Sequence, residues 1–293
     1  MTLKASYSLT ADRGPASVSN SKAIINSYNT WRPFTSMKES GLILSSVENS
    51  ELTYEKKHEL NIGAEIGFID NRINIEADWY TRNNFDLIGL IYTKGTGGQL
   101  AKFANVASMK SSGVEFTVST RNIKTKDFSW NTDFIFSHTK NEVTDLQSNA
   151  SVMDMISGNG FAMEGYPVRA LFSMDFQGLN ENGYPTFINE KGQLTVSDIN
   201  FQEQLKKDHL VYEGPTDPTM TGSLGNIFRY KGFTLNAFIT YSFGNVIRLD
   251  PVFHNVYSDL DAMPREFINR WTTGGDEKVT NVPVIADKRA NQQ

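Results

Sequence analysis

The chain has 293 residues and a formal net charge of −5, from 28 Lys plus Arg against 33 Asp plus Glu, and this balance without a dense basic run argues against a nucleic-acid partner. Cysteine is absent, which excludes disulfides, thiolate catalysis and Cys-ligated metals. Only 39% of the residues are hydrophobic whereas 12% are aromatic, a composition that suits a β-barrel wall around a polar lumen.

Strict alternation of apolar and polar residues begins near the N-terminus. Residues 3–10 carry apolar side chains at odd positions and polar ones at even positions, the period of a strand with two different faces. The same period runs through residues 57–68 and 72–79, on either side of Asp70-Asn71, a dipeptide suited to a tight turn. These two segments predict a long hairpin with one apolar and one polar face.

Two more hairpins are predicted further along the chain. Residues 114–121 and 128–137 alternate around a turn over residues 122–126, and residues 224–230 and 233–243 alternate around Lys231-Gly232. Such strands reach the roughly 9–11 residues that a tilted strand needs to cross a bilayer. Long loops are expected over residues 14–54, 89–109 and 141–218. Short turns at one end and long loops at the other are typical of an outer-membrane barrel.

Hydropathy alone gives a different indication. No stretch approaches the roughly 20 apolar residues of a transmembrane helix, and residues 1–7 lack the apolar core of a signal peptide. This would favour a soluble cytoplasmic protein, but the alternation outweighs it because spanning strands give a weak hydropathy signal. A short helix is also predicted over residues 259–271, with Asp259 or Asp261 as its cap and Pro264 in its first turn.

Residues that could carry chemistry lack the spacing that chemistry requires. The four histidines are scattered without metal-ligand spacing: His58, His138, His209 and His254. Asp259 and Asp261 lack the further oxygen ligands of a calcium loop. Residues 95–98 lack the Lys-Ser/Thr of a phosphate loop, and no Gly-x-Ser-x-Gly elbow occurs. We therefore predict no enzyme activity, no catalytic residue, no cofactor and no metal site.

The aromatic residues form two candidate sets. The first lies near strand ends or on the apolar face, where amphipathic rings favour the lipid–water interface: Trp79, Tyr80, Trp130, Tyr230 and Tyr241. Ordinary packing within the sheet is the alternative for this set. The second lies in the expected loops, where the rings could stack on sugars or peptide side chains or pack within the loop: Phe161, Tyr166, Tyr184 and Tyr257.

Five sequence stretches occur in a consistent order. They read NSELTYE at 49–55, NIGAEIGF with NRI and DWY at 61–80, NVASM through GVE at 105–115, FSWNT at 128–132 and YKGFTL at 230–235. Together they resemble the SusC/RagA-type TonB-dependent transporters of the outer membrane of Bacteroidota. Tyr54 stands where the family usually has Trp, and Ser112 where it has Asn.

This resemblance implies an all-β fold, an antiparallel transmembrane β-barrel with long extracellular loops. Residues 1–293 would be part of one TonB-dependent receptor β-barrel domain, supplying about eight to ten of its roughly 22 strands. No plug domain, TonB box or terminal aromatic strand is recognisable, so we expect both ends to be truncated.

The resemblance also implies an importer in the cell outer membrane. Its partners would be outer-membrane lipid, a SusD-like surface lipoprotein, TonB acting through the missing plug, and an oligosaccharide or peptide substrate. A passive porin-like barrel and a soluble carbohydrate-binding β-sandwich are the alternatives. From the alternation, one set is expected to face lipid: Leu60, Ile62, Ile66, Ile73, Ile75, Phe116, Leu235 and Ile239. A second set is expected to face the lumen: Glu65, Glu76, Glu115 and Asn236.

Overall fold

The computed structural model describes residues 1–14, 22–30, 39–92, 101–147, 150–158, 160–252 and 263–285. Backbone contacts divide the chain into two compact units. The first contains residues 1–148, 162–168 and 218–243, and the second contains residues 149–161, 169–217 and 244–293. Within the described ranges, no helix has both the length and the apolar composition needed to span a membrane.

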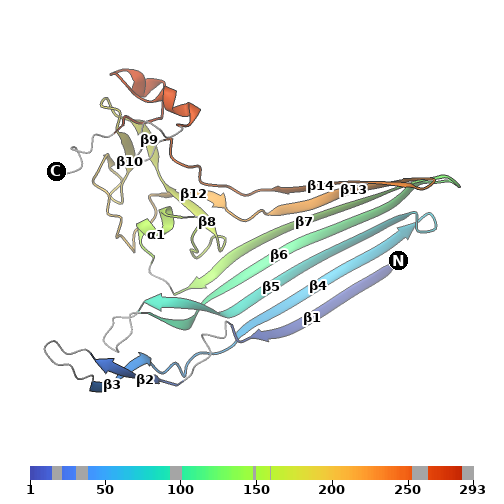
Figure 1. Ribbon diagram of the computed structural model, residues 1–293, viewed down its shortest axis with the longest axis horizontal. Helices are drawn as coiled ribbons and strands as arrows, with labels where there is room; N and C mark the ends of the chain where they lie inside the picture. The colour runs from blue at the N-terminus through green and yellow to red at the C-terminus, as the bar shows by residue number, and fades with distance from the viewer. Residues whose placement is uncertain are drawn as a thin grey trace. The chain divides into compact units, whose positions relative to one another are not determined.

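The first unit is built on a seven-stranded antiparallel sheet, in the order β1-β4-β5-β6-β7-β13-β14, whose strands lie side by side in Figure 1. Its strands are β1 (Thr2–Asp12), β4 (Glu55–Phe68), β5 (Ile73–Tyr92), β6 (Ala101–Lys124), β7 (Phe128–Leu146), β13 (Met220–Tyr230) and β14 (Phe233–Phe243). The three predicted hairpins and the first strand are therefore confirmed. Among the described residues, this sheet has seven strands, and the long segments between hairpins form small sheets of their own.

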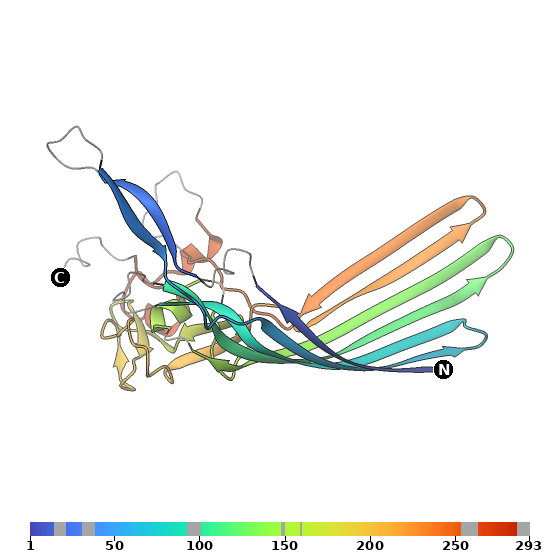
Figure 2. The same ribbon diagram turned by 90° about the horizontal axis from the view of Figure 1, so that it is seen from below.

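Short turns join the three hairpins at one end of this sheet, the end at which the chain starts (Figure 2). The turn between β4 and β5 has left-handed φ angles of 51° at Asp70 and 59° at Asn71. The two-residue turn between β13 and β14 has a φ of 50° at Lys231. Positive φ angles in such tight turns match the right-handed twist of paired strands. The turn residues identified in the sequence therefore set the hairpin registers.

The connections at the other end contain more structure than expected. The prediction of a loop over residues 89–109 is wrong, because β5 continues to Tyr92 and β6 begins at Ala101, with Leu90 opposite Phe103. A register shift between Asn84 and Leu87 lets the ladder continue. Within residues 14–54, β2 (Ile24–Thr30) pairs with β3 (Glu39–Ser46).

The second unit consists of short elements. Strand β8 (Ala170–Met174) pairs with β12 (Leu210–Pro215), and β10 (Pro185–Ile188) lies between β9 (Phe176–Leu179) and β11 (Leu194–Thr195). Helix α1 (Val152–Ile156) starts at a capping box, in which Ser151 accepts from the Asp154 amide and the Asp154 carboxylate accepts from the Ser151 amide. The core of this unit is formed by buried side chains: Val152, Met155, Ala170, Leu171 and Phe172.

The predicted helix over residues 259–271 is only partly within the described residues. In the described part of this range the structure has one 3₁₀ turn, η2 (Arg265–Asn269), and a second, η3 (Asp276–Lys278), follows it. Pro264 directly precedes η2, as its fixed φ favours. Asp259 and Asp261 lie outside the described residues, so their predicted role as caps stays a prediction.

Candidate functional site

Cross-strand register divides the seven-stranded sheet into an apolar and a polar face. One row of directly opposed residues crosses six strands: Ile66, Ile75, Val118, Phe134, Leu224 and Ile239. The eight residues predicted to face lipid all lie on this apolar face. The predicted lumen residues lie on the opposite face, where Glu65 is paired with Glu76 and Asp78 with Glu115. The division into two faces is therefore confirmed.

The apolar face has the extent that an outer membrane requires. Strand β14 presents six residues to it: Phe233, Leu235, Ala237, Ile239, Tyr241 and Phe243. At about 3.3 Å per residue, this strand segment is about 33 Å long, or about 25 Å of membrane depth at a tilt of about 40°. Several of these side chains are open to their surroundings, including Leu235 and Ile239, each 64% exposed. Such exposure of large apolar residues suits contact with lipid.

Four of the predicted interface aromatics lie on the apolar face. Trp130 and Tyr230 lie toward the short turns, where the Trp130 ring stacks on Phe228 with centroids 5.6 Å apart. Trp79, opposite Ile62, and Tyr241 lie in the half toward the long connections. Aromatic girdles at both borders are typical of membrane barrels. This arrangement supports an interface role for the four residues, which stays a proposal.

Tyr80 lies on the polar face instead. Trp79 and Tyr80 are consecutive in β5, and consecutive strand residues point to opposite faces. The Tyr80 side chain is buried, its hydroxyl is 2.7 Å from the Thr139 Oγ1, and the Arg82 guanidinium lies 4.2 Å from its ring centroid. The opposing Gly113 makes room for the ring, because a Cβ there would lie 2.5 Å from the Tyr80 hydroxyl. The predicted lipid-interface position is therefore wrong for Tyr80.

Charged side chains on the polar face form ion pairs across strands. Lys4 Nζ lies 2.7 Å from Glu76 and 3.4 Å from Glu65. Arg82 Nε lies 3.0 Å from Glu59, as an ion pair without the alignment of a hydrogen bond. The exposed Lys4 pairs contribute little stability, but charged pairs make this face compatible with a watery lumen.

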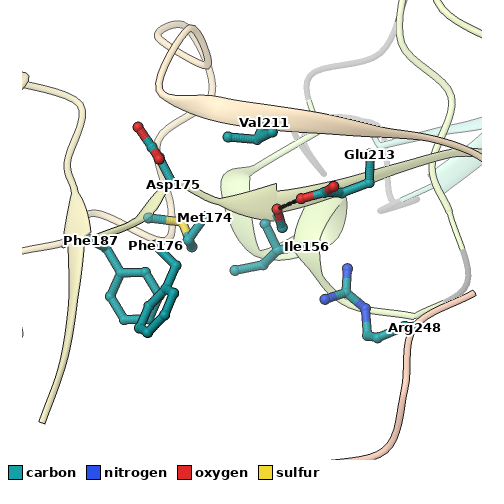
Figure 3. Close-up of a pocket in the computed structure, with 9 residues that line it drawn as sticks. Ile156, Met174, Asp175, Phe176, Phe187, Val211, Glu213 and Arg248 are labelled. Carbon is teal, nitrogen blue, oxygen red and sulfur yellow. Dashed lines mark hydrogen bonds between the residues drawn. The ribbon is translucent and has the colours of Figure 1, made fainter. Parts of the chain in front are cut away.

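The second unit contains a pocket of about 510 Å³. Figure 3 shows the rings of Phe176 and Phe187 side by side at one end, with centroids 5.8 Å apart, and Arg248 and Glu213 at the other. Glu213 accepts a hydrogen bond from the Ser173 hydroxyl. The pocket therefore combines an apolar aromatic surface with groups of both charges.

Local structure explains how the pocket is assembled. Strands β9 and β10 place Phe176 directly opposite Phe187, across the Asn182-Gly183 turn. Strand β12 has an irregularity at Gly214, where φ is 138° and the register of its pairing with β8 shifts. The guanidinium of Arg248 donates to the carbonyl of Phe172 at 2.8 Å, which holds it at this site.

The three predicted loop aromatics within the described residues do not line this pocket. Phe161 forms an isolated bridge with Ala170, the Tyr166 carbonyl accepts from the Val143 amide, and the Tyr184 amide donates to Asn180. Tyr257 lies outside the described residues. The pocket rings Phe176 and Phe187 were not among the candidates. The Asn-Gly dipeptide between them is a hairpin signal that could have paired them.

The described histidines are separate from one another. His58 lies 3.1 Å from the Tyr7 hydroxyl through Nδ1, and both ring nitrogens of His209 are buried without a hydrogen-bond partner. Within the described ranges, no group of three or more His, Cys, Asp or Glu could hold a metal ion. His254 lies outside these ranges.

Comparison with known proteins agrees with this geometry. No protein-family model matches the chain. TonB-dependent receptor P3 of Formosa agariphila is 23% identical over 286 residues, which are 90% of this chain and 28% of that receptor. TonB-dependent receptor SusC of Bacteroides thetaiotaomicron is 27% identical over 241 residues, 73% of this chain and 23% of SusC. The chain thus spans less than a third of the length of these curated relatives.

A solved structure shares the fold. The RagAB peptide transporter structure matches with a TM-score of 0.75 and 24% identity, over 96% of this chain and 31% of the other. The open antiparallel sheet, with its apolar and polar faces, therefore has the fold of part of the barrel of that transporter.

The chain is a homologue of the SusC/RagA-type TonB-dependent receptors, as the five sequence stretches predicted. The names of these relatives describe TonB-dependent receptors and a peptide transporter.

Proposed function

We propose that the chain forms part of the barrel wall and loops of an outer-membrane importer of oligosaccharides or peptides. Import is energised by TonB through a plug domain, and a SusD-like surface lipoprotein helps to hold the substrate. The observation that carries this proposal is the two-faced sheet, whose register and extent match a membrane barrel and whose fold matches the RagAB peptide transporter. The relatives' names support TonB dependence.

The pocket of the second unit is the proposed substrate contact in this chain. The Phe176 and Phe187 rings offer an apolar surface for a sugar face or a peptide side chain. Arg248 and Glu213 offer charge to a carboxylate or an amino group. Long loops on a barrel are the usual location of such sites, which supports a role in binding for this unit.

Uptake by cells tests the energised mechanism. Cells whose only copy of the importer is this protein are given labelled oligosaccharides or peptides, with and without functional TonB. Import predicts that uptake stops without TonB. Uptake that continues unchanged would favour the passive porin-like barrel. The fold match over 96% of the chain already favours a barrel over the soluble β-sandwich.

A matched pair of variants tests the pocket. Phe176→Ala removes a ring that is 39% exposed in the pocket, and Phe201→Ala removes a ring that is 37% exposed elsewhere in the same unit. Losing one stacking ring should weaken substrate binding by about tenfold for Phe176 and leave it unchanged for Phe201. Equal affinity of the two variants would contradict a role for the pocket, without bearing on TonB dependence.

A further inference from the structure

Two lysines lie on the apolar face of the sheet, beyond the apolar band. Lys140 of β7 is opposite Ser112, and Lys110 of β6 is opposite Glu142. Alternation places both on the face that carries Val114 and Phe116. They are diagonal neighbours on adjacent strands, so their side chains can approach one another. Both are exposed.

Their depth matches the border of the membrane on the side of the long connections. Along β7 the apolar face runs from Trp130 near the short turns through Phe134 and Phe136 to His138, and Lys140 follows. Ten residues from Trp130 to Lys140 cover about 33 Å of strand, or about 25 Å of depth at a tilt of about 40°. The two lysines are therefore expected at the level of lipid headgroups. In an outer-membrane barrel the long loops are extracellular, so these headgroups belong to the outer leaflet.

Neither lysine forms an ion pair with a described carboxylate, although Glu142 lies opposite Lys110 on the same face. Among the described residues, Lys110 and Lys140 have no ion-pair partner, and the opposing Glu142 makes none with Lys110. Elsewhere in the same sheet, by contrast, Lys4 and Lys56 each have a carboxylate oxygen at 2.7 Å.

Neighbouring polar side chains could complete an anion site. Thr81 is opposite Ser112 and Asn83 is opposite Lys110, so all four lie on the same face. Hydroxyl and amide groups can donate to phosphate oxygens beside the two ammonium groups. These donors and charges occupy the two rows next to the lipid-facing band, where a headgroup would lie.

We propose that Lys110 and Lys140 bind the phosphate groups of an outer-leaflet glycolipid, the phosphorylated lipid A part of lipopolysaccharide. Two adjacent unpaired ammonium groups match a phosphorylated headgroup in charge. The acyl chains of the same lipid would lie along the apolar residues below. The proposal rests on the orientation of the barrel in the outer membrane and does not depend on which substrate is imported.

The test uses the complete protein extracted from outer membranes and titrated with bis-phosphorylated lipid A in detergent. The double variant Lys110→Gln/Lys140→Gln is compared with Lys124→Gln/Lys126→Gln, a control with the same charge change at the short-turn end of the same hairpin. At about fivefold per lysine, the first variant should lose about twenty-fivefold in affinity and the control should lose none. The variant Lys110→Arg/Lys140→Arg should retain binding.

Three results would overturn the proposal. The first is that the two double variants bind lipid A with equal affinity. The second is that the unmodified protein binds dephosphorylated lipid A as tightly as bis-phosphorylated lipid A. The third is that the protein binds inorganic phosphate as tightly as lipid A, which would indicate a general anion site rather than a lipid site. Heat-modifiable gel migration verifies that each variant is folded. Because uptake is measured separately, a negative result for lipid A binding does not bear on the proposed import.

Discussion

Replacing Ile62 by arginine places a charge on the apolar face of β4. The apolar face of this strand runs from Leu60 to Phe68 with Ala64 at its centre, and Ile62 is 50% exposed on it. Two residues from the centre correspond to about 5 Å of depth at a tilt of about 40°. An arginine costs about 2–4 kcal/mol at the midplane and about 0–1 near the interfaces, so Ile62→Arg should cost about 2 kcal/mol.

The assay is reversible unfolding by denaturant of the complete protein folded into lipid vesicles. The control is Thr117→Arg on the polar face, where the new guanidinium lies opposite Glu76 and should cost less than about 0.5 kcal/mol. A loss of about 2 kcal/mol corresponds to about a thirtyfold change in the folding equilibrium. Equal free energies of unfolding for the two variants, or a larger loss for Thr117→Arg, would refute lipid exposure of Ile62.

Two further predictions concern close packing and capping. Gly113→Ala would place a Cβ 2.5 Å from the Tyr80 hydroxyl and 2.6 Å from a backbone carbonyl oxygen, whereas Gly232→Ala meets nothing within 4 Å. Unfolding free energies should therefore show a loss of about 1–3 kcal/mol for the first and little for the second, and equal losses would contradict the close approach. At α1, hydrogen bonds from the Ser151 amide and then its hydroxyl hold the pKa of Asp154 below its ordinary value of 3.8. A lowered pKa means that the charged carboxylate stabilises the cap above about pH 3.8 and that this contribution is lost as pH falls through the folded-state pKa. Carboxyl NMR titration should show the pKa of Asp154 rising toward 3.8 in Ser151→Ala, and an unchanged midpoint would contradict the contribution of the hydroxyl.

The main sheet was predictable from sequence because each long strand has an apolar face of period two and each hairpin has a short polar turn. The alternation in residues 57–68 and 72–79 determined both the pairing and the face of Glu65. The ring type of Tyr80 alone does not predict its face, whereas its position next to Trp79 does, because adjacent strand residues cannot share a face.

The second unit was not predictable in the same way. Its strands are two to six residues long, too short for a clear period. The pairing of β8 with β12 joins segments about 40 residues apart, which no local signal indicates. Phe176 and Phe187 flank a recognisable Asn-Gly turn, but the position of Arg248 beside them depends on tertiary contacts.

Contact between the apolar face of the sheet and lipid can be tested directly by single-cysteine substitution along β5, because these 293 residues contain no cysteine. Ile75→Cys, Ala77→Cys, Glu76→Cys and Asp78→Cys are introduced one at a time into the complete protein in outer membranes, and each is treated with a lipid-soluble or a small water-soluble thiol reagent. We expect strict alternation, with positions 75 and 77 reacting with the lipid-soluble reagent and positions 76 and 78 with the water-soluble one. Equal reactivity of all four positions with the water-soluble reagent, or the reverse alternation, would contradict a lipid-facing apolar surface.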